Sequence, residues 1–177
     1  MTNSLFFDDD GLSAFLWIGK ENLLTMLYPG QVVIPRQVYV EFSAPTIPQL
    51  KSRIDVLLSN NQISIADIQV GTEIFDLYYQ LAVEPKNGYK IIGKGEAAAI
   101  VLTKFYDGIL ASNNLSDITY YIKEFNLKHI TTAEILNEAF ERGYISEIDG
   151  NKLWSAMISR RRLLGYKSFS DYLLTLK

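Results

Sequence analysis

The chain has 177 residues, a formal net charge of −3 at pH 7 and no cysteine. This length suits one domain with a substantial core. The absence of cysteine excludes disulfides, thiolate zinc sites and cysteine nucleophiles. Because His129 is the only histidine, a metal site in this chain is expected to use oxygen ligands and to hold Mg²⁺ or Mn²⁺.

Two global features bear on location and partners. The sequence contains no run of about eighteen apolar residues, which predicts that no helix crosses a membrane. The first residues lack the basic-then-apolar pattern of a signal peptide, so the expected location is the cytoplasm. The mildly acidic charge argues against nucleic-acid binding by bulk charge, although it leaves open a local basic patch or contact through metal ions.

Apolar runs and helical patterns alternate along the chain. Strands are expected at residues 5–7, 31–34, 62–68, 109–112 and 129–130. Helices are expected at residues 12–18, 21–28, 35–44, 46–60, 73–83, 94–107, 117–125, 132–142, 147–163 and 168–176. Short apolar strands between helices predict parallel βαβ units. The predicted fold class is therefore α/β: a three-layer α/β/α sandwich with a short parallel sheet of four to five strands, plus extra C-terminal helices.

Local signals mark the expected helix ends. Asp9 or Asp10 is expected to cap the first helix, and Ser116 the helix at residues 117–125. Pro35 is expected in the first turn of its helix, where its missing N–H costs nothing. Gly143 is expected to end the helix before it.

Acidic and amide side chains follow the predicted strands. In an open parallel sheet, ligands bind beyond the carboxyl ends of the strands. If the strands at residues 5–7 and 109–112 are neighbours, these polar groups meet at one edge. The groups concerned are Asp8, Asp9, Asp10, Glu41, Glu96, Ser112, Asn113, Asn114 and Asp117, of which Asp9 is expected to face outward.

Such a patch supports metal-assisted hydrolysis of a phosphodiester bond. Bound divalent ions lower the pKa of a water molecule and neutralise the charge that builds on the phosphate. Each residue also has an ordinary structural explanation. Asp10 can be a helix cap, Glu96 a partner of the helix dipole, Glu41 a solvated residue and Asn113-Asn114 a common turn. His129 on its short strand is expected to be structural.

The order of these motifs resembles PIN-domain nucleases, especially small bacterial ones that act as toxins of toxin–antitoxin pairs. The similarity spans about residues 5–145. The motifs that carry it are Phe7-Asp8-Asp9-Asp10-Gly11-Leu12, then Val32-Val33-Ile34-Pro35 with Val38 and Glu41, then Gly95-Glu96-Ala97-Ala98-Ala99-Ile100, and finally Ile109-Leu110-Ala111-Ser112-Asn113-Asn114 with Ile130-Thr131-Thr132.

The resemblance implies a ribonuclease that depends on Mg²⁺ or Mn²⁺. The catalytic residues that it implies are Asp8, Glu41, Glu96 and Asp117. The metal ligands are Asp8, Asp10, Glu96 and Asn114. Family members usually carry Asp where this chain has Asn113 or Asn114, and an amide oxygen brings no negative charge. A weak or inactive site, in a PIN-like binding module, is therefore the first alternative.

The opening motif is also similar to that of haloacid-dehalogenase-like phosphatases. In those enzymes the first Asp is the nucleophile and the Asp two residues later is the acid. The Thr that usually follows the Gly is replaced by Leu12, however. The later acidic pair that holds Mg²⁺ is also missing, because Thr131-Thr132 follows the candidate strand. A phosphatase is the second alternative.

The domain organisation expected from the resemblance is a PIN-like domain at residues 1–145 and a helical extension at residues 146–177, packed on the same domain. The apolar face of the extension either covers the core or binds an antitoxin protein or a second copy of the chain. Its basic triplet, Arg160-Arg161-Arg162, is either a solvated helix end or a nucleic-acid-binding patch. The implied partners are an RNA substrate, an antitoxin and a homodimer mate.

Overall fold

The structure, a computed structural model, describes residues 3–86 and 88–177. Within these residues the strands form one parallel five-stranded sheet in the order β3-β2-β1-β4-β5. The strands are β1 (Leu5–Phe7), β2 (Val32–Pro35), β3 (Ser64–Ala66), β4 (Ile109–Ala111) and β5 (Lys128–Ile130). Because β1 pairs directly with β4, the predicted neighbour relation of these strands is confirmed.

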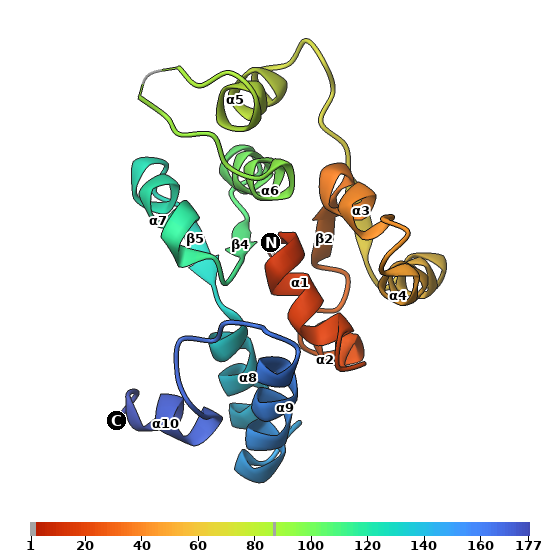
Figure 1. Cartoon of the computed structure of the whole chain (residues 1–177), viewed down its shortest axis with the longest axis vertical. Helices are drawn as coiled ribbons and strands as arrows, with labels where there is room; N and C mark the ends of the chain where they lie inside the picture. Colours follow the sequence, from red (N-terminus) through yellow and green to blue (C-terminus); the bar gives the residue numbers. More distant parts are fainter. Residues whose placement is uncertain (1–2, 87) are drawn as a thin grey trace.

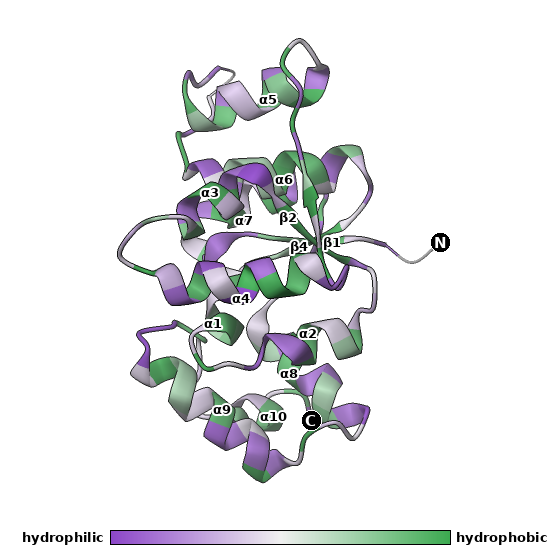
Figure 2. Ribbon diagram, turned by 90° about the vertical axis from the view of Figure 1, so that its right-hand side faces the viewer, coloured by the Kyte–Doolittle hydropathy of each residue, from purple (hydrophilic) through white to green (hydrophobic). Residues whose placement is uncertain are grey.

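Helices connect the strands and cover both faces of the sheet (Figures 1 and 2). In chain order they are α1 (Asp9–Leu16), α2 (Glu21–Leu27), α3 (Arg36–Phe42), α4 (Pro48–Ser59), α5 (Glu73–Ala82), α6 (Lys94–Phe105), α7 (Leu115–Glu124), α8 (Thr132–Glu141), α9 (Glu147–Ser159) and α10 (Phe169–Leu174). The α/β class and the three-layer sandwich are therefore confirmed.

The side chains of the central strand β1 alternate between the two layers of helices. Leu5 and Phe7 belong to the apolar core that includes α1, α4 and α8. Phe6 points the other way and packs with Leu102 of α6. This alternation is the ordinary period of two of a β-strand. Both faces of β1 are therefore buried, and polar side chains can approach the surface only beyond its carboxyl end.

The C-terminal helices share the main core. Trp154, Met157 and Phe169 are fully buried and belong to the same apolar cluster as Phe7. A Cβ atom on Gly150 would lie 2.2 Å from Cδ1 of Phe169, so α9 and α10 touch at a position that only glycine fits. In Figure 1, α8, α9 and α10 lie together at one end of the molecule. The division of the chain at residue 145 stays a prediction.

Three local expectations were wrong. Asp8, not Asp9 or Asp10, caps α1, because its extended backbone (ψ 178°) directs its carboxylate towards the first N–H groups of the helix. Pro35 ends β2 and precedes α3 instead of lying in its first turn. Asn114, not Ser116, precedes α7, and its side chain makes no capping bond.

The expected end of α8 is confirmed, whereas α9 is shorter than predicted. Gly143 adopts a φ of +71° directly after α8, the left-handed conformation that often follows a helix. The helix expected at residues 147–163 ends at Ser159, and Arg161 has a φ of +60°. None of the helices among the described residues has the length and hydrophobicity needed to cross a bilayer.

Candidate functional site

Asp8 lies at the carboxyl end of β1 and is fully buried. Its Oδ1 accepts a hydrogen bond of 2.7 Å from the Gly11 N–H, and its Oδ2 has no hydrogen-bond partner. Burial raises the pKa of Asp8 well above its usual range, and the charges of Asp9 and Asp10 add to this effect. The Ser112 hydroxyl and the Gly11 N–H oppose it only in part. An unpaired buried carboxylate is unfavourable, so such a group is stabilised by binding a proton or a cation.

Gly11 explains how Asp8 reaches this position. A Cβ atom at residue 11 would lie 2.6 Å from the carbonyl oxygen of Ala111 and 3.1 Å from Oδ1 of Asp8. Both distances are shorter than an ordinary contact, so α1 starts too close to β4 for any larger residue. The glycine of the opening motif therefore has a steric role.

Asn114 links two carboxylates at the end of β4. Its amide nitrogen donates to Oε1 of Glu96 at 2.5 Å and to Oδ2 of Asp117 at 2.8 Å. Glu96 is nearly buried and also accepts from the Gly93 N–H at 3.1 Å. Burial raises the pKa of Glu96, while these N–H groups lower it. The amide thus offsets the repulsion that would otherwise arise between two acids.

Glu41 reaches the same edge from α3. Its side chain is exposed, but its Oε1 accepts from the Gly95 N–H at the start of α6 at 3.0 Å. Partial burial of the carboxylate raises its pKa, and the charges of Asp9 and Glu96 raise it further. These three carboxylates therefore lie within electrostatic reach of one another.

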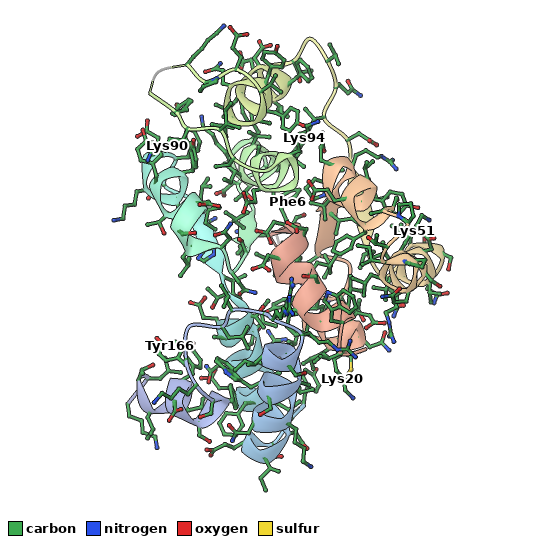
Figure 3. The ribbon with its side chains drawn as sticks, in the orientation of Figure 1. Phe6, Lys20, Lys51, Lys90, Lys94 and Tyr166 are labelled. Carbon is green, nitrogen blue, oxygen red and sulfur yellow. The ribbon has the colours of Figure 1, made fainter. Side chains whose placement is uncertain are left out.

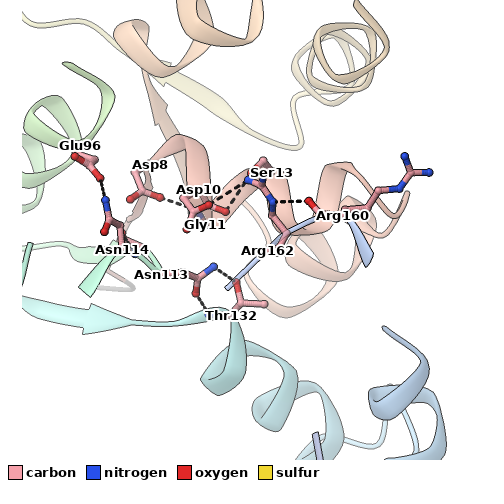
Figure 4. Close-up of polar contacts among 11 residues, drawn as sticks. Asp8, Asp10, Gly11, Ser13, Glu96, Asn113, Asn114, Thr132, Arg160 and Arg162 are labelled. Atoms are coloured by element: carbon pink, nitrogen blue, oxygen red, sulfur yellow. Dashed lines mark hydrogen bonds and ion pairs between the residues drawn. The ribbon is translucent and has the colours of Figure 1, made fainter. Parts of the chain in front are cut away.

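Asp10 is already paired. Its Oδ1 lies 3.1 Å from a guanidinium nitrogen of Arg162, and the same nitrogen donates to the Ser13 hydroxyl at 2.9 Å (Figure 4). Burial raises the pKa of Asp10 and the charge of Arg162 lowers it. Asp10 could bind a metal only if this ion pair broke, so it is the weakest of the predicted ligands.

The two asparagines after β4 have separate roles. Asn113 accepts from the Thr132 N–H at 2.9 Å and donates to the Thr132 hydroxyl at 2.8 Å, so it ties β4 to the start of α8. Asn114 is the one beside Glu96 (Figure 4). Nε2 of His129 lies 2.9 Å from the Ser112 carbonyl oxygen, and burial lowers the pKa of His129. His129 therefore supports β4 as a neutral ring.

A cavity of about 1020 Å³ opens at this edge of the sheet. Asp9, Glu96 and Asn114 line one side, and the segment between α9 and α10 lines another, including Arg161 and Tyr166. The sequence predicted no metal-binding or catalytic role for Asp9 and no role for Tyr166. Three consecutive acids do not reveal which of them faces a cavity. No local pattern marks a tyrosine far along the chain as a neighbour of this site.

The donor set fits a hard divalent cation. Asp8 Oδ2 is a buried, unpartnered carboxylate oxygen of the type that Mg²⁺ and Mn²⁺ prefer. The oxygens of Glu96 accept from the Asn114 amide and the Gly93 N–H, and the Asn114 oxygen accepts from the Ser116 hydroxyl at 2.7 Å, so these groups would bind a cation only by exchanging a partner. Among residues 3–86 and 88–177, no three Asp, Glu, His or Cys side chains already form a group that could hold a metal ion. A site here would therefore use water beside the carboxylates.

Comparison of the sequence with protein-family models and with curated proteins found no match.

Proposed function

We propose that this chain is a PIN-like endoribonuclease that uses Mg²⁺ or Mn²⁺. The observation that carries the proposal is the buried carboxylate of Asp8 at the carboxyl end of β1, which has an oxygen without a partner, with Glu96 held beside Asn114 at the end of β4. Glu41 reaches the same edge through the Gly95 N–H. Buried acids with raised pKa values, such as Asp8 and Glu96, are typical of functional sites.

The residues at this edge suit distinct roles. Asp8 and Glu96 are the candidate ligands, and a bound cation would activate water and neutralise charge on the scissile phosphate. Glu41 is held by the Gly95 N–H and is placed to orient a water molecule. Asn114 and Asp117 hold Glu96 in place through the amide bridge.

The toxin role is part of the same proposal. It predicts that expression of the chain arrests growth and that an antitoxin protein relieves the arrest. A homodimer mate and a cytoplasmic location belong to this proposal as well. Co-expression with the protein encoded by a neighbouring gene, followed by a growth assay, tests it.

The experiment that tests the enzymatic proposal is cleavage of RNA by the purified chain with Mn²⁺. Glu96→Gln should reduce the rate about 100-fold, because loss of a group that supports a bound metal typically costs about 10–100-fold in metal affinity or activity. Glu124→Gln on the exposed side of α7 is the matched control and should cleave normally. Absence of cleavage by the wild type, together with no Mn²⁺ binding in calorimetry, would refute the proposal.

The binding-module alternative draws support from Asn114, which stands where the family usually has an acid. It predicts RNA or protein binding without cleavage and without Mn²⁺ binding. The phosphatase alternative is disfavoured by two contacts: one carboxylate oxygen of Asp8 caps α1 through the Gly11 N–H, and Asp10 is paired with Arg162. A phosphorylated Asp8 in mass spectrometry would restore it.

A further inference from the structure

The wall of the cavity opposite the carboxylates comes from residues 161–166, between α9 and α10. Arg161, Leu163, Leu164, Gly165 and Tyr166 all line it. This loop passes beside the start of α1 (Figure 1), although it lies far along the sequence from the motifs at the carboxylate edge. The cavity is therefore assembled from two parts of the chain.

The loop is anchored at two of its residues, Arg162 and Tyr166. Arg162 is bonded to Asp10 and Ser13 at the start of α1. The indole N–H of the fully buried Trp154 donates to the Tyr166 carbonyl oxygen at 3.1 Å. These two anchors give the segment a defined position relative to Asp9 and Glu96.

Arg161 stands out among the three arginines. The Arg160 guanidinium lies 5.7 Å from the centroid of the Trp17 ring, and Arg162 is bonded to Asp10. Within the part of the chain that the structure describes, no carboxylate pairs with Arg161, which lines the cavity.

The backbone of Arg161 is strained. Its φ is +60°. The other described residues with positive φ, glycines aside, are Asn61, Asp107 and Asn126. Asn and Asp tolerate this conformation far better than a long side chain does. Arg161 follows the end of α9, where the left-handed conformation commonly closes a helix and glycine would be less costly than arginine.

Tyr166, labelled in Figure 3, supplies an aromatic surface to the cavity that Arg161 also lines. It is 42% exposed, and its ring lies 5.2 Å from the ring of the buried Tyr172. Leu163, which is 80% exposed, adds apolar surface on the same segment. A tyrosine ring that packs against a buried ring and is partly exposed to solvent can stack on a flat ligand.

We infer that residues 161–166 form the substrate-binding wall, in which Arg161 binds a phosphate and Tyr166 stacks on an unpaired base of single-stranded RNA. Arginine suits phosphate, and base stacking on aromatic rings is the common mode of single-strand binding. Bases of duplex RNA stay stacked on each other, so the wall favours single strands. This inference rests on the proposed function, which places the scissile phosphate at Asp8 and Glu96.

Charge and shape favour this occupant over a protein segment. An apolar peptide would bury the Arg161 guanidinium without a counter-charge, which is unfavourable. Asp9, Glu96 and Glu134 also line the cavity and repel phosphate, so Arg161 is the group on this lining whose charge favours one. A polynucleotide offers a base to Tyr166 and a phosphate to Arg161. The cavity of about 1020 Å³ is at the upper end of the range of about 300–1,000 Å³ for small-molecule sites.

The test measures binding separately from cleavage. Fluorescence anisotropy of a labelled single-stranded oligoribonucleotide in EDTA compares the full wild-type chain with Arg161→Gly, Tyr166→Ala and Tyr166→Phe. Arg161→Gly and Tyr166→Ala should each bind about tenfold more weakly, and Tyr166→Phe should bind like the wild type. Because glycine relieves the strain, Arg161→Gly should unfold at no lower urea concentration than the wild type, which excludes misfolding as the cause.

Two controls match the Arg161 variant. Asn126→Gly makes the same backbone change at a φ of +50°, and Lys152→Ala removes an exposed cation from α9; both should bind RNA normally. Unchanged binding by Arg161→Gly and Tyr166→Ala, or equally tight binding of duplex RNA, would overturn the inference. The inference would also be overturned if the wild-type chain did not bind RNA but bound a co-expressed protein through Arg161.

The two proposals fail in different ways. If the wild type does not cleave RNA with Mn²⁺, yet the Arg161 and Tyr166 variants lose binding, the enzymatic proposal fails and the binding wall stands. If the wild type cleaves RNA and these variants bind unchanged, only the binding wall fails.

Discussion

Asp8 uses its two carboxylate oxygens in different ways. Oδ1 caps α1 through the Gly11 N–H, whereas Oδ2 is buried without a partner. Its neighbours Asp9 and Asp10 make the negative charge still less favourable. The arrangement is unfavourable for stability alone, and this is the usual physical mark of a residue kept for function.

Asp8→Asn should therefore stabilise the metal-free protein at pH 7. Asparagine keeps the oxygen that caps α1 and removes the buried charge, so the free energy of unfolding should rise by about 1–2 kcal/mol. Because the folded-state pKa of Asp8 is raised, its share of wild-type stability is present at low pH and is lost as the pH rises above about 4. Urea unfolding in EDTA across pH measures both effects.

The variant should lose that part of the pH dependence, together with any stabilisation by Mn²⁺. Asp76→Asn, on the exposed side of α5, is the control and should retain both. A variant less stable than the wild type at pH 7 would show that the charge of Asp8 is compensated within the protein.

Asn114→Asp should make stability depend on metal. It replaces the amide that bridges Glu96 and Asp117 by a third carboxylate, so the metal-free protein should lose about 1–3 kcal/mol. Mn²⁺ should raise the unfolding temperature of this variant more than that of the wild type. Asn113→Asp is the matched control, since Asn113 is bonded to Thr132 and lies outside the carboxylate pair. An equal response to Mn²⁺ in both variants would contradict this role of Asn114.

At the scale of elements, α9 and α10 approach each other most closely at Gly150. The ring of Phe169 lies against the backbone of Gly150, where no Cβ fits. The same pair of helices carries the loop with Arg161 and Tyr166. Their packing therefore sets the width of the cavity.

Gly150→Ala should destabilise the protein, although replacing glycine by alanine within a helix ordinarily stabilises it. Alanine in a helix normally gains about 1 kcal/mol over glycine, but here its methyl group would collide with Phe169. Overpacking should instead lower the free energy of unfolding by about 1–3 kcal/mol. Chemical denaturation measures it, with Ser155→Ala on the exposed side of α9 as the control that should change little. A more stable Gly150→Ala protein would mean that α10 moves freely away from α9.

At the scale of the molecule, the central strand and the last helices share one core. Phe7 of β1 and Trp154 of α9 are both fully buried in the same apolar cluster. A chain cut after residue 145 would expose the surfaces of α1 and α8 that pack in this cluster. The extension is thus structural as well as a wall of the cavity.

The full chain should unfold in one transition. Fluorescence of Trp17 and Trp154 should change at the same urea concentration as the helical circular dichroism, as expected for one cooperative unit. A chain of residues 1–145 should lack a cooperative transition, because it loses fully buried side chains worth about 2–5 kcal/mol each. Cooperative unfolding of the shortened chain would show two independent units.

Much of this fold could be predicted from local patterns. The apolar alternation of β1 and the amphipathic helices around it appear within short windows, because a period of two or 3.6 is a local property. Helix ends were less predictable. Whether Asp8 or Asp10 caps α1 depends on the backbone conformation of one residue, and three consecutive acids offer the same side chain in each place.

The sequence by itself determined the layered fold, the lack of cysteine, and the strand ends where Asp8 and Asn114 lie. Only the tertiary structure decided which groups are free to act. Arg162 forms an ion pair with Asp10, which lies 152 residues earlier in the chain. Asn113 is hydrogen-bonded to Thr132. It also placed Arg161 and Tyr166 on the wall opposite the carboxylates. The physical reason is that packing brings such residues together, whereas local periodicity describes only neighbours in the chain.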